Sequence, residues 1–332
     1  MKSRLIDIAR RAGVSTITAS RALGGGGLVA EATRKRILAA AAELGYVPNL
    51  IARGLVQKRT SVVGVLLREL ANPFFAPMLR GIERAAELRG YLVVVGESGL
   101  DEQRESCYVD RFRQLRMGGM IVTPASSRVH HLLVARSAGT PVVVMARRWE
   151  EGDYVTGDNL EGGRLVARHL LSRGHRLIGL LRPDEPDNTA IQDRTNGFKE
   201  VLAAASVLVP PQWDFLTPST MIADGAESAD RIRELSRRPT AIFVTTDRQA
   251  LGLIRRLRAH GVRVPEDLAV VGYDDIPYAD CGQVPLTSVA VPVERIGEMS
   301  AEVLFDRMRN PGACEFRQIL LPPQLVVRDS SP

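Results

Sequence analysis

Polar and charged residues follow a series of short apolar runs along the chain, and each run has the length of a buried β-strand. When such strands are parallel, their carboxyl ends meet at one edge of a sheet, where α/β proteins bind their ligands. Any single pair could be ordinary loop chemistry, but recurrence at successive strand ends favours a cleft for a polar ligand. The residues are Arg68-Glu69, Glu97-Ser98, Thr123, Arg147-Arg148, Arg182, Thr245-Thr246-Asp247 and Asp274-Asp275.

A second candidate site lies near the N-terminus, where positive charge is concentrated. Residues 1–60 contain eleven Lys or Arg and three acids, a net charge of +8, whereas the remaining residues carry −2. This separation is typical of a segment that binds the phosphate groups of nucleic acid. The alternative, a merely solvated positive surface, does not explain why the whole excess lies in one segment.

Short helices without strands are expected to form this basic segment. Apolar residues at helical spacing predict a first helix that ends at Gly13, and Ser15 is placed to cap a second helix that ends at Leu23. A third helix is expected from about Glu31 to Leu44, with Ile37, Leu38, Ala41 and Leu44 on one face. Helix, turn and helix in this order is the arrangement that sets a recognition helix into the DNA major groove.

From Ser61 onward, strand-like runs alternate with helical segments, which predicts an α/β fold with doubly wound parallel sheets. About nine or ten strands in this length favour two sheets rather than one. The clearest strands are expected at 62–67, 92–95, 120–122, 142–145, 177–181, 241–244 and 268–271. Helices are expected at 75–89, 162–172, 196–204, 228–236 and 250–260.

Several other classes of protein lack support in the sequence. No uninterrupted apolar stretch reaches about 18 residues, so no membrane span is expected, and Asp7 and Arg10 interrupt any signal-peptide core. Cys107, Cys281 and Cys314 have no paired spacing, and each is expected to be a small core residue in a reducing cytoplasm. No phosphate-loop, nucleophile-elbow or metal-ligand pattern is present, so we expect no enzyme activity, catalytic residue, cofactor or metal.

Two sets of ordered motifs run through the chain. The N-terminal set is Ile6-Asp7-Ile8-Ala9, Ala12-Gly13-Val14-Ser15, Thr18-Ala19-Ser20-Arg21, Ala32-Thr33-Arg34, Leu44-Gly45-Tyr46-Val47-Pro48-Asn49 and Ala52-Arg53-Gly54-Leu55. The set in the body is Asn72-Pro73-Phe74-Phe75, Asp158-Asn159-Leu160-Glu161-Gly162-Gly163-Arg164, Arg173-Gly174-His175, Arg194-Thr195-Asn196-Gly197-Phe198, Gly261-Val262-Arg263-Val264-Pro265-Glu266-Asp267, Val271-Gly272-Tyr273-Asp274-Asp275 and Pro285-Leu286-Thr287-Ser288-Val289. Through these motifs the sequence resembles, over essentially its whole length, the lactose-repressor (LacI/GalR) family of bacterial transcription regulators.

The resemblance implies three parts. Residues 1–48 are expected to form a helix-turn-helix DNA-binding head, and residues 49–60 a hinge helix or linker. Residues 61–332 are expected to form a two-lobed, periplasmic-binding-protein-like core for effector binding and dimerisation. Its N-terminal lobe would comprise about 61–160 and 291–320, and its C-terminal lobe about 161–290 and 321–332.

For the head and hinge, the resemblance implies binding to a pseudo-palindromic, double-stranded operator. Arg21 suits a bidentate contact with guanine, and Ile17 an apolar contact with a thymine methyl; the alternative for Ile17 is packing inside the head. Leu55 matches a residue that wedges into the minor groove, with ordinary linker packing as its alternative. The expected DNA-binding residues are Ser15, Thr16, Ile17, Thr18, Ser20, Arg21, Asn49, Arg53 and Leu55.

For the body, the resemblance implies that a small polar effector, a sugar or sugar acid, binds between the lobes and controls operator affinity. Arg194 and Asp274 match effector-contacting residues, and Thr246 stands where the family usually has Asn. Phe75 would either pack on the effector or belong to an apolar stripe at the dimer face. Arg68, Arg147 and Arg148 would be either carboxylate ligands or ordinary surface residues. The expected effector-binding residues are Phe75, Thr123, Arg147, Arg194, Thr246 and Asp274.

The molecule is therefore expected to be a homodimeric repressor in the cytoplasm, associated with the nucleoid. Its dimer would form mainly through the N-terminal lobe and the 75–89 helix. Ala19 and Ala30 replace a usual core Val and a usual capping Ser, and Gly54 replaces Ser or Thr in the hinge, so the head is expected to be loosely held. The alternative, a periplasmic sugar-binding protein, conflicts with the basic helical head and the missing signal peptide.

Overall fold

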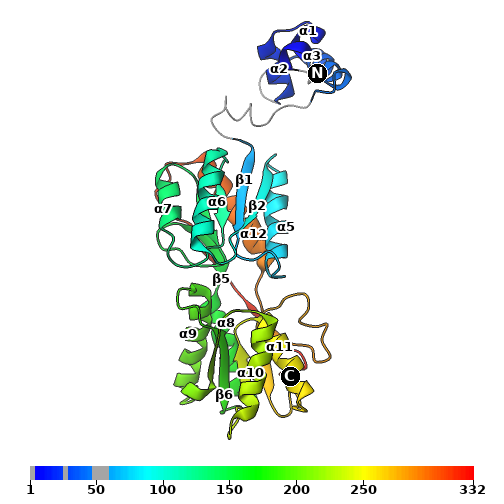
Figure 1. Ribbon diagram of the computed structural model, residues 1–332. Coiled ribbons are helices and arrows are strands. Elements are labelled where there is room, and N and C mark those ends of the chain that lie inside the picture. Colours follow the sequence, from blue (N-terminus) through cyan, green and yellow to red (C-terminus); the bar gives the residue numbers. More distant parts are fainter. Residues whose placement is uncertain (1–3, 25–28, 47–59) are drawn as a thin grey trace. The chain divides into compact units, whose positions relative to one another are not determined.

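A computed structural model describes residues 4–24, 29–46 and 60–332. The chain divides into two compact units, Met1–Thr60 and Ser61–Pro332 (Figure 1). The first unit holds three described helices, and the second holds two α/β lobes. The fold class predicted from the sequence, a helix-turn-helix head with a two-lobed body of doubly wound sheets, is confirmed.

The head consists of α1 (Leu5–Ala12), α2 (Thr16–Leu23) and α3 (Glu31–Glu43). Ser15 caps α2 as predicted, because its Oγ accepts a hydrogen bond from the Thr18 amide at 3.1 Å. The small core is rich in alanine; it consists of Ile8, Ala9, Ala12, Ala19, Ala22, Ile37, Ala40 and Ala41. Leu38 was predicted on the buried face of α3 but is 50% exposed, because one residue beyond Ile37 the helix has turned by about 100°.

The body is built from two six-stranded sheets with helices packed on them. The N-terminal lobe contains β1 (Val62–Leu67), α5 (Phe75–Glu87), β2 (Leu92–Glu97), α6 (Glu102–Gln114), β3 (Met120–Val122), α7 (His130–Ser137), β4 (Val142–Met145), β5 (Asp153–Gly157), α12 (Val293–Arg309) and β11 (Gln318–Leu321). The C-terminal lobe contains α8 (Asn159–Ser172), β6 (Ile178–Pro183), α9 (Thr189–Ala204), η1 (Pro211–Trp213), β7 (Asp214–Thr217), α10 (Ile222–Glu234), β8 (Ala241–Val244), α11 (Asp247–Ala259), β9 (Ala269–Asp274), β10 (Thr287–Ala290) and β12 (Gln324–Val326).

The two sheets share one topology. Their strand orders are β11-β5-β4-β3-β1-β2 and β12-β10-β9-β8-β6-β7, and only the β10–β12 pairing is antiparallel among the described strands. The chain crosses between the lobes three times, after β5, after β10 and after β11. In each sheet the order reverses beside the first strand, β1 or β6, and ligands of doubly wound folds bind at such points.

Three helix pairs in the body approach so closely that only glycine fits at the crossing. A Cβ at Gly163 of α8 would lie 2.0 Å from the Arg194 carbonyl oxygen, and one at Gly197 of α9 would lie 1.9 Å from that of Leu160. The α5–α12 and α10–α11 pairs repeat this reciprocal arrangement. The glycines therefore fix α9, and with it Arg194, against α8.

Some local expectations from the sequence are wrong. All three cysteines are exposed rather than buried. The apolar stripe of α5 is not a dimer face, because Phe75, Met78 and Ile82 are buried in the core of their own lobe, where α5 packs on α12. Strands β5, β7, β10, β11 and β12 were not expected from the sequence, because their runs are short or carry polar residues. No described helix is long and apolar enough to cross a membrane.

Substitution of Gly197 tests the close packing of α8 and α9. Gly197→Ala should lower the free energy of unfolding by about 1–3 kcal/mol, because the new methyl group forces the two helices apart. Urea denaturation measures the change. Gly312→Ala is the matched control, since a Cβ there meets no atom within 4 Å; equal stability of the two variants would contradict the packing argument.

Candidate functional site

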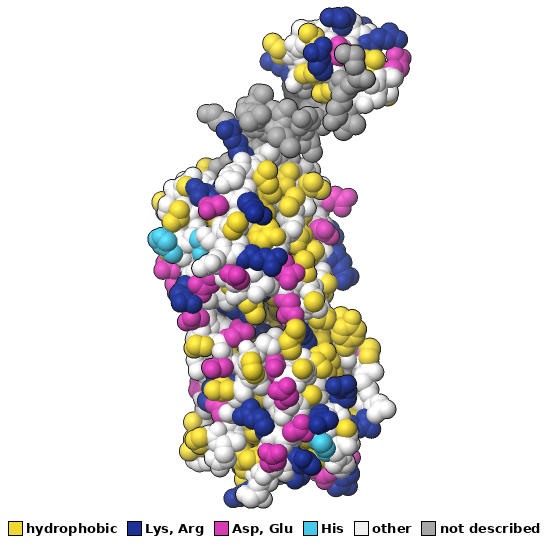
Figure 2. All heavy atoms as spheres, in the orientation of Figure 1, with side chains coloured by type: hydrophobic (Ala, Val, Ile, Leu, Met, Phe, Trp, Pro, Cys, Tyr) yellow, Lys and Arg dark blue, Asp and Glu magenta, His cyan; other side chains and the backbone are white. Residues whose placement is uncertain are grey.

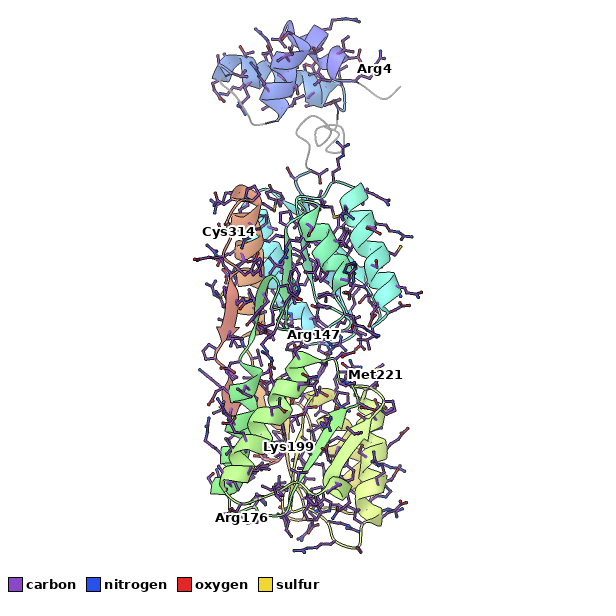
Figure 3. The ribbon with its side chains drawn as sticks, turned by 90° about the vertical axis from the view of Figure 1, so that its left-hand side faces the viewer. Arg4, Arg147, Arg176, Lys199, Met221 and Cys314 are labelled. Atoms are coloured by element: carbon purple, nitrogen blue, oxygen red, sulfur yellow. The ribbon has the colours of Figure 1, made fainter. Side chains whose placement is uncertain are left out.

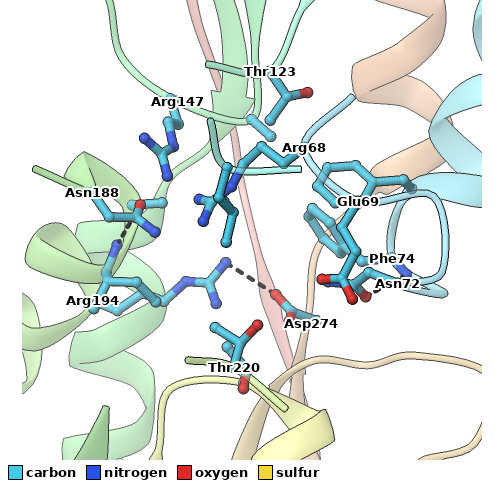
Figure 4. Close-up of a pocket in the computed structure, with 16 residues that line it drawn as sticks. Arg68, Glu69, Asn72, Phe74, Thr123, Arg147, Asn188, Arg194, Thr220 and Asp274 are labelled. Carbon is cyan, nitrogen blue, oxygen red and sulfur yellow. Dashed lines mark hydrogen bonds and ion pairs between the residues drawn. The ribbon is translucent and has the colours of Figure 1, made fainter. Parts of the chain in front are cut away.

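One pocket lies where the strand ends of the two lobes face each other. All six residues expected to bind the effector line it: Phe75, Thr123, Arg147, Arg194, Thr246 and Asp274. They reach it from α5, from the ends of β3 and β4, from α9, and from the ends of β8 and β9. The space between them is about 600 Å³, part of which is open to solvent. We call it the effector pocket (Figure 4).

Arg194 organises the C-terminal side of this pocket. Its Nε donates to Asn159 Oδ1 at 2.9 Å and its Nη1 to the Thr245 carbonyl at 2.6 Å, and its Nη2 lies 3.0 Å from Asp274 Oδ1. The guanidinium also stacks on the Tyr273 ring, with 3.7 Å from Cζ to the ring centroid. Since every one of these partners belongs to the same lobe, Arg194 joins α8, β8 and β9 before any ligand arrives.

Asp274 is held in a strained and poorly solvated position. Burial raises the pKa of its carboxyl group to about 6, although the neighbouring Arg194 acts in the opposite direction. Its φ angle is +112°, and Leu100 and Ala146, which also line the pocket, have φ angles of +65° and +63°. Non-glycine residues rarely adopt such angles, and they concentrate at ligand-binding and catalytic sites.

Three buried polar atoms at the pocket have no hydrogen-bond partner among the described residues. They are Thr123 Oγ1, Arg147 Nη2 and Asp274 Oδ1, the last of which has only its ion pair with Arg194. Thr123 is 2% exposed, Arg147 4% and Asp274 9%. An unsatisfied buried polar group costs about 1–3 kcal/mol. Three of them in one pocket therefore form a ready set of donors and acceptors for a polar ligand.

Ion pairs join the two lobes around the pocket. Glu185 of the C-terminal lobe accepts a hydrogen bond from Arg68 at 2.9 Å and lies 3.6 Å from Arg147. Farther out, Arg148 donates to both carboxylate oxygens of Asp193, at 2.8 and 2.9 Å.

On the other side of the pocket, Arg248 Nη1 of α11 donates to Glu69 Oε2 at 2.7 Å. Arg68 and Arg147 face the pocket, whereas Arg148 is tied to Asp193. Figure 3 shows Arg147 at the end of the N-terminal lobe that faces the other lobe.

Several pocket residues were not among those expected. Arg68 and Glu69 follow β1, and the sequence had already placed them among the polar residues at strand ends. Asn72 and Phe74 belong to a motif noted in the sequence but were not expected in the pocket, and the others had no sequence signal, because they come from the start of α9 or from irregular loops. These others are Leu100, Ala146, Asn188, Ala190, Ile191 and Thr220.

In the head, four of the expected DNA-binding residues share one exposed face of α2. Thr16, Ile17, Ser20 and Arg21 are exposed, whereas Ala19 and Ala22 of the same helix are buried. Ile17 is 63% exposed, so it does not pack inside the described part of the head. Ser15 is exposed at the cap, and Thr18 is half-buried. Asn49, Arg53 and Leu55 lie outside the residues that the structure describes.

Comparison with known proteins places this geometry in a family. Residues 4–49 match the model for bacterial regulatory proteins of the lacI family, and residues 167–331 match the model for a periplasmic binding protein-like domain. The HTH-type transcriptional repressor PurR of Photobacterium profundum is 35% identical over 335 residues, which cover 98% of this chain and 97% of the relative. The chain belongs to the lacI family of bacterial regulatory proteins.

Solved structures of the family agree over the full length. The Lac repressor dimer bound to operator and the anti-inducer ONPF is 26% identical, with a TM-score of 0.88 and coverage of 100% of this chain and 99% of that chain. The transcriptional regulator CelR in complex with cellobiose is 31% identical, with a TM-score of 0.73 and coverage of 99% and 100%. This member of the family is thus a DNA-binding, ligand-regulated transcriptional repressor and not an enzyme.

The pH dependence of stability tests the burial of the Asp274 charge. Between about pH 4 and pH 6 the folded chain holds a proton on Asp274 that the unfolded chain has released, so the stability contribution of this group falls as pH rises. Asp274→Asn does not titrate. Its free energy of unfolding, relative to the wild type, should therefore increase by about 2 kcal/mol from pH 4 to pH 7. Parallel curves from denaturant titrations would contradict this.

Substitution in the head tests the exposed face of α2. Arg21→Ala should remove about 1–3 kcal/mol of preference for one base pair of the selected sequence, because the guanidinium is expected to bind guanine. Selection from a random DNA library, followed by affinity measurements, shows the change. Lys58→Ala should weaken binding to all sequences alike and flatten the salt dependence. An unchanged preferred sequence in Arg21→Ala would show that this face does not contact bases.

Proposed function

We propose that this repressor binds a pseudo-palindromic operator as a homodimer in the cytoplasm, and that a sugar or sugar acid in the effector pocket controls its affinity for that DNA. The choice of ligand rests on one observation: buried polar atoms of Thr123, Arg147 and Asp274 have no hydrogen-bond partner among the described residues. A hydroxyl, a guanidinium and a carboxylate suit a ligand with several hydroxyl groups.

The charge of the pocket favours an acidic sugar over a neutral one. Arg68, Arg147 and Arg194 line it together with only two acids, Glu69 and Asp274. Arg194 is already bound to its own lobe. Arg68 and Arg147 share the single carboxylate of Glu185, so they can take up a ligand carboxylate as a second partner. Phe74 and Phe75 supply an apolar wall.

DNA recognition is proposed for the head and the hinge. Thr16, Ile17 and Arg21 would contact base edges, and Ser15, Thr18 and Ser20 the phosphates that fix register. Asn49, Arg53 and Leu55 would act in the hinge, with Leu55 in the minor groove. The +8 charge of residues 1–60 supports this assignment, because phosphate neutralisation supplies much of the binding free energy.

An exposed apolar edge of the N-terminal lobe supports the homodimer. β2 is the edge strand of its sheet, and Leu88, Leu92 and Val94 beside and on it are 81%, 58% and 36% exposed. Figure 2 shows hydrophobic side chains gathered on this side of the lobe. Soluble proteins rarely leave an apolar edge strand uncovered. A second copy of the chain would cover it, and the Lac repressor of similar fold is a dimer.

Regulation would act through the ion pairs that join the lobes. A carboxylate bound by Arg68 and Arg147 competes with Glu185 for the same donors, so the ligand changes the contacts that set the angle between the lobes. An effector that prefers one lobe arrangement shifts the population of that arrangement, and with it the affinity for DNA.

A thermal-shift screen against sugars, sugar acids, polyols, phosphosugars and nucleobases tests the proposal. A ligand at about 100 times its dissociation constant should stabilise the body by about 2.7 kcal/mol. We expect hits among sugar acids. A response to nucleobases alone would overturn the proposed ligand class, and a response to neutral sugars alone would overturn the preference for an acidic sugar.

Thr123→Val supplies the structural control for that screen. Without effector this variant should be more stable than the wild type by about 1 kcal/mol, because an unsatisfied hydroxyl has been removed, yet it should bind the effector more weakly. Thr287→Val is the matched variant, since its buried Oγ1 already donates to the Arg328 carbonyl at 2.8 Å. That variant should lose stability and keep its affinity for the effector.

A further inference from the structure

A second hollow adjoins the effector pocket. The space between its lining residues is about 680 Å³, part of which is open to solvent, and it lies between the loops that follow β3 and β4 in the N-terminal lobe and the start of α9 in the C-terminal lobe. Ser126, Ser127, Trp149 and Asp187 line this second hollow and do not line the effector pocket. Nothing in the proposed function uses it.

Three segments contribute residues to both spaces. Thr123 lines the effector pocket and Pro124 the second hollow; Ala146 lines the former and Arg148 the latter. In the third segment Asn188 lines the effector pocket, whereas Asp187 and Thr189 line the second hollow. Arg147 is the one described residue that lines both spaces, so it lies at the junction between them.

At this junction, Arg147 has a hydrogen-bond donor without a partner. Arg147 is 4% exposed, and its Nη2 has no hydrogen-bond partner among the described residues; the nearest acid, Glu185, is 3.6 Å away. Its Nη1 donates only weakly, to the Ala125 carbonyl at 3.4 Å. A buried guanidinium with free donors between two spaces is placed to bind a molecule that occupies both of them.

The chemistry of the second hollow differs from that of the effector pocket. Ser126, Ser127 and Thr189 offer hydroxyl groups, and Glu150, Glu151 and Asp187 offer carboxylates. Arg148, the other cation of the hollow, is already paired with Asp193. These groups accept hydrogen bonds from neutral hydroxyls and repel a second anion. The second hollow therefore suits a neutral sugar unit, whereas the effector pocket suits an acidic one.

We propose that the effector is a disaccharide with one carboxylate. Its acidic unit occupies the effector pocket and its neutral unit the second hollow, and Arg147 donates to the oxygens that lie between them. This inference rests on the proposed function, because it presupposes that a sugar acid binds in the effector pocket.

Matched pairs of acids test the inference in the full-length protein. We would measure by calorimetry the binding of gluconate against lactobionate and cellobionate, and of galacturonate and glucuronate against disaccharides that carry one of these acids. For at least one pair, the disaccharide should bind at least tenfold more tightly than its monosaccharide. Ser127→Trp, which fills the second hollow from an exposed loop position, should reduce that ratio to within twofold while leaving monosaccharide affinity unchanged.

Two further variants keep the result interpretable. Ser236→Trp, at an exposed position of the C-terminal lobe, should preserve the ratio. Asp187→Tyr enters the hollow from the opposite lobe and replaces Ser127→Trp if that variant fails to fold, as judged by its melting curve and operator binding. Equal affinities for both members of every pair, or a ratio unaffected by either filling variant, would overturn the inference and leave the sugar-acid proposal standing. Binding of no acid in the series would overturn both.

Discussion

The buried guanidinium of Arg194 is the interaction on which the arrangement of the C-terminal side of the pocket depends. It joins the side chain of Asn159, the end of β8 and the carboxylate of Asp274, and it lies flat on Tyr273. Breaking a buried ion pair costs about 3–5 kcal/mol, so these contacts favour one arrangement of the groups that Arg194 joins. The glycine contacts between α8 and α9 place Arg194 where this is possible.

The N-terminal side of the pocket is organised differently. Arg68 and Arg147 reach across to one acid of the other lobe, and a buried hydroxyl and a guanidinium nitrogen there lack partners among the described residues. The C-terminal side of the pocket is thus held in place by Arg194 without a ligand, whereas the N-terminal side has no such central group among the residues that the structure describes. This asymmetry gives a ligand a fixed surface to bind and a set of contacts between the lobes to change, which is what an allosteric effector requires.

The architecture and much of the effector pocket could be predicted from the sequence, and the reasons are physical. The strands β1, β3, β4 and β8 are continuous apolar runs buried on both faces, so their ends could be read directly, and those ends place Arg68, Thr123, Arg147 and Thr246 in one pocket. Strands such as β5 and β10 carry Asp, Thr and Ser, and their burial depends on long-range partners that no local pattern shows. Pocket residues from loops and helix starts, such as Leu100 and Asn188, were missed for the same reason. Arg194 was found only through the family resemblance, which also assigned an effector contact to Asp274, a residue already noted at a strand end.

The central claim, that the effector pocket and the DNA-binding head are thermodynamically coupled, is tested most directly by measuring reciprocity. Operator affinity would be measured with and without saturating effector, and effector affinity with and without saturating operator, on the same full-length protein. The account predicts that both affinities change by the same factor, about 5- to 150-fold for a typical coupling free energy of 1–3 kcal/mol. Effector affinity that is the same in free and operator-bound protein would contradict it.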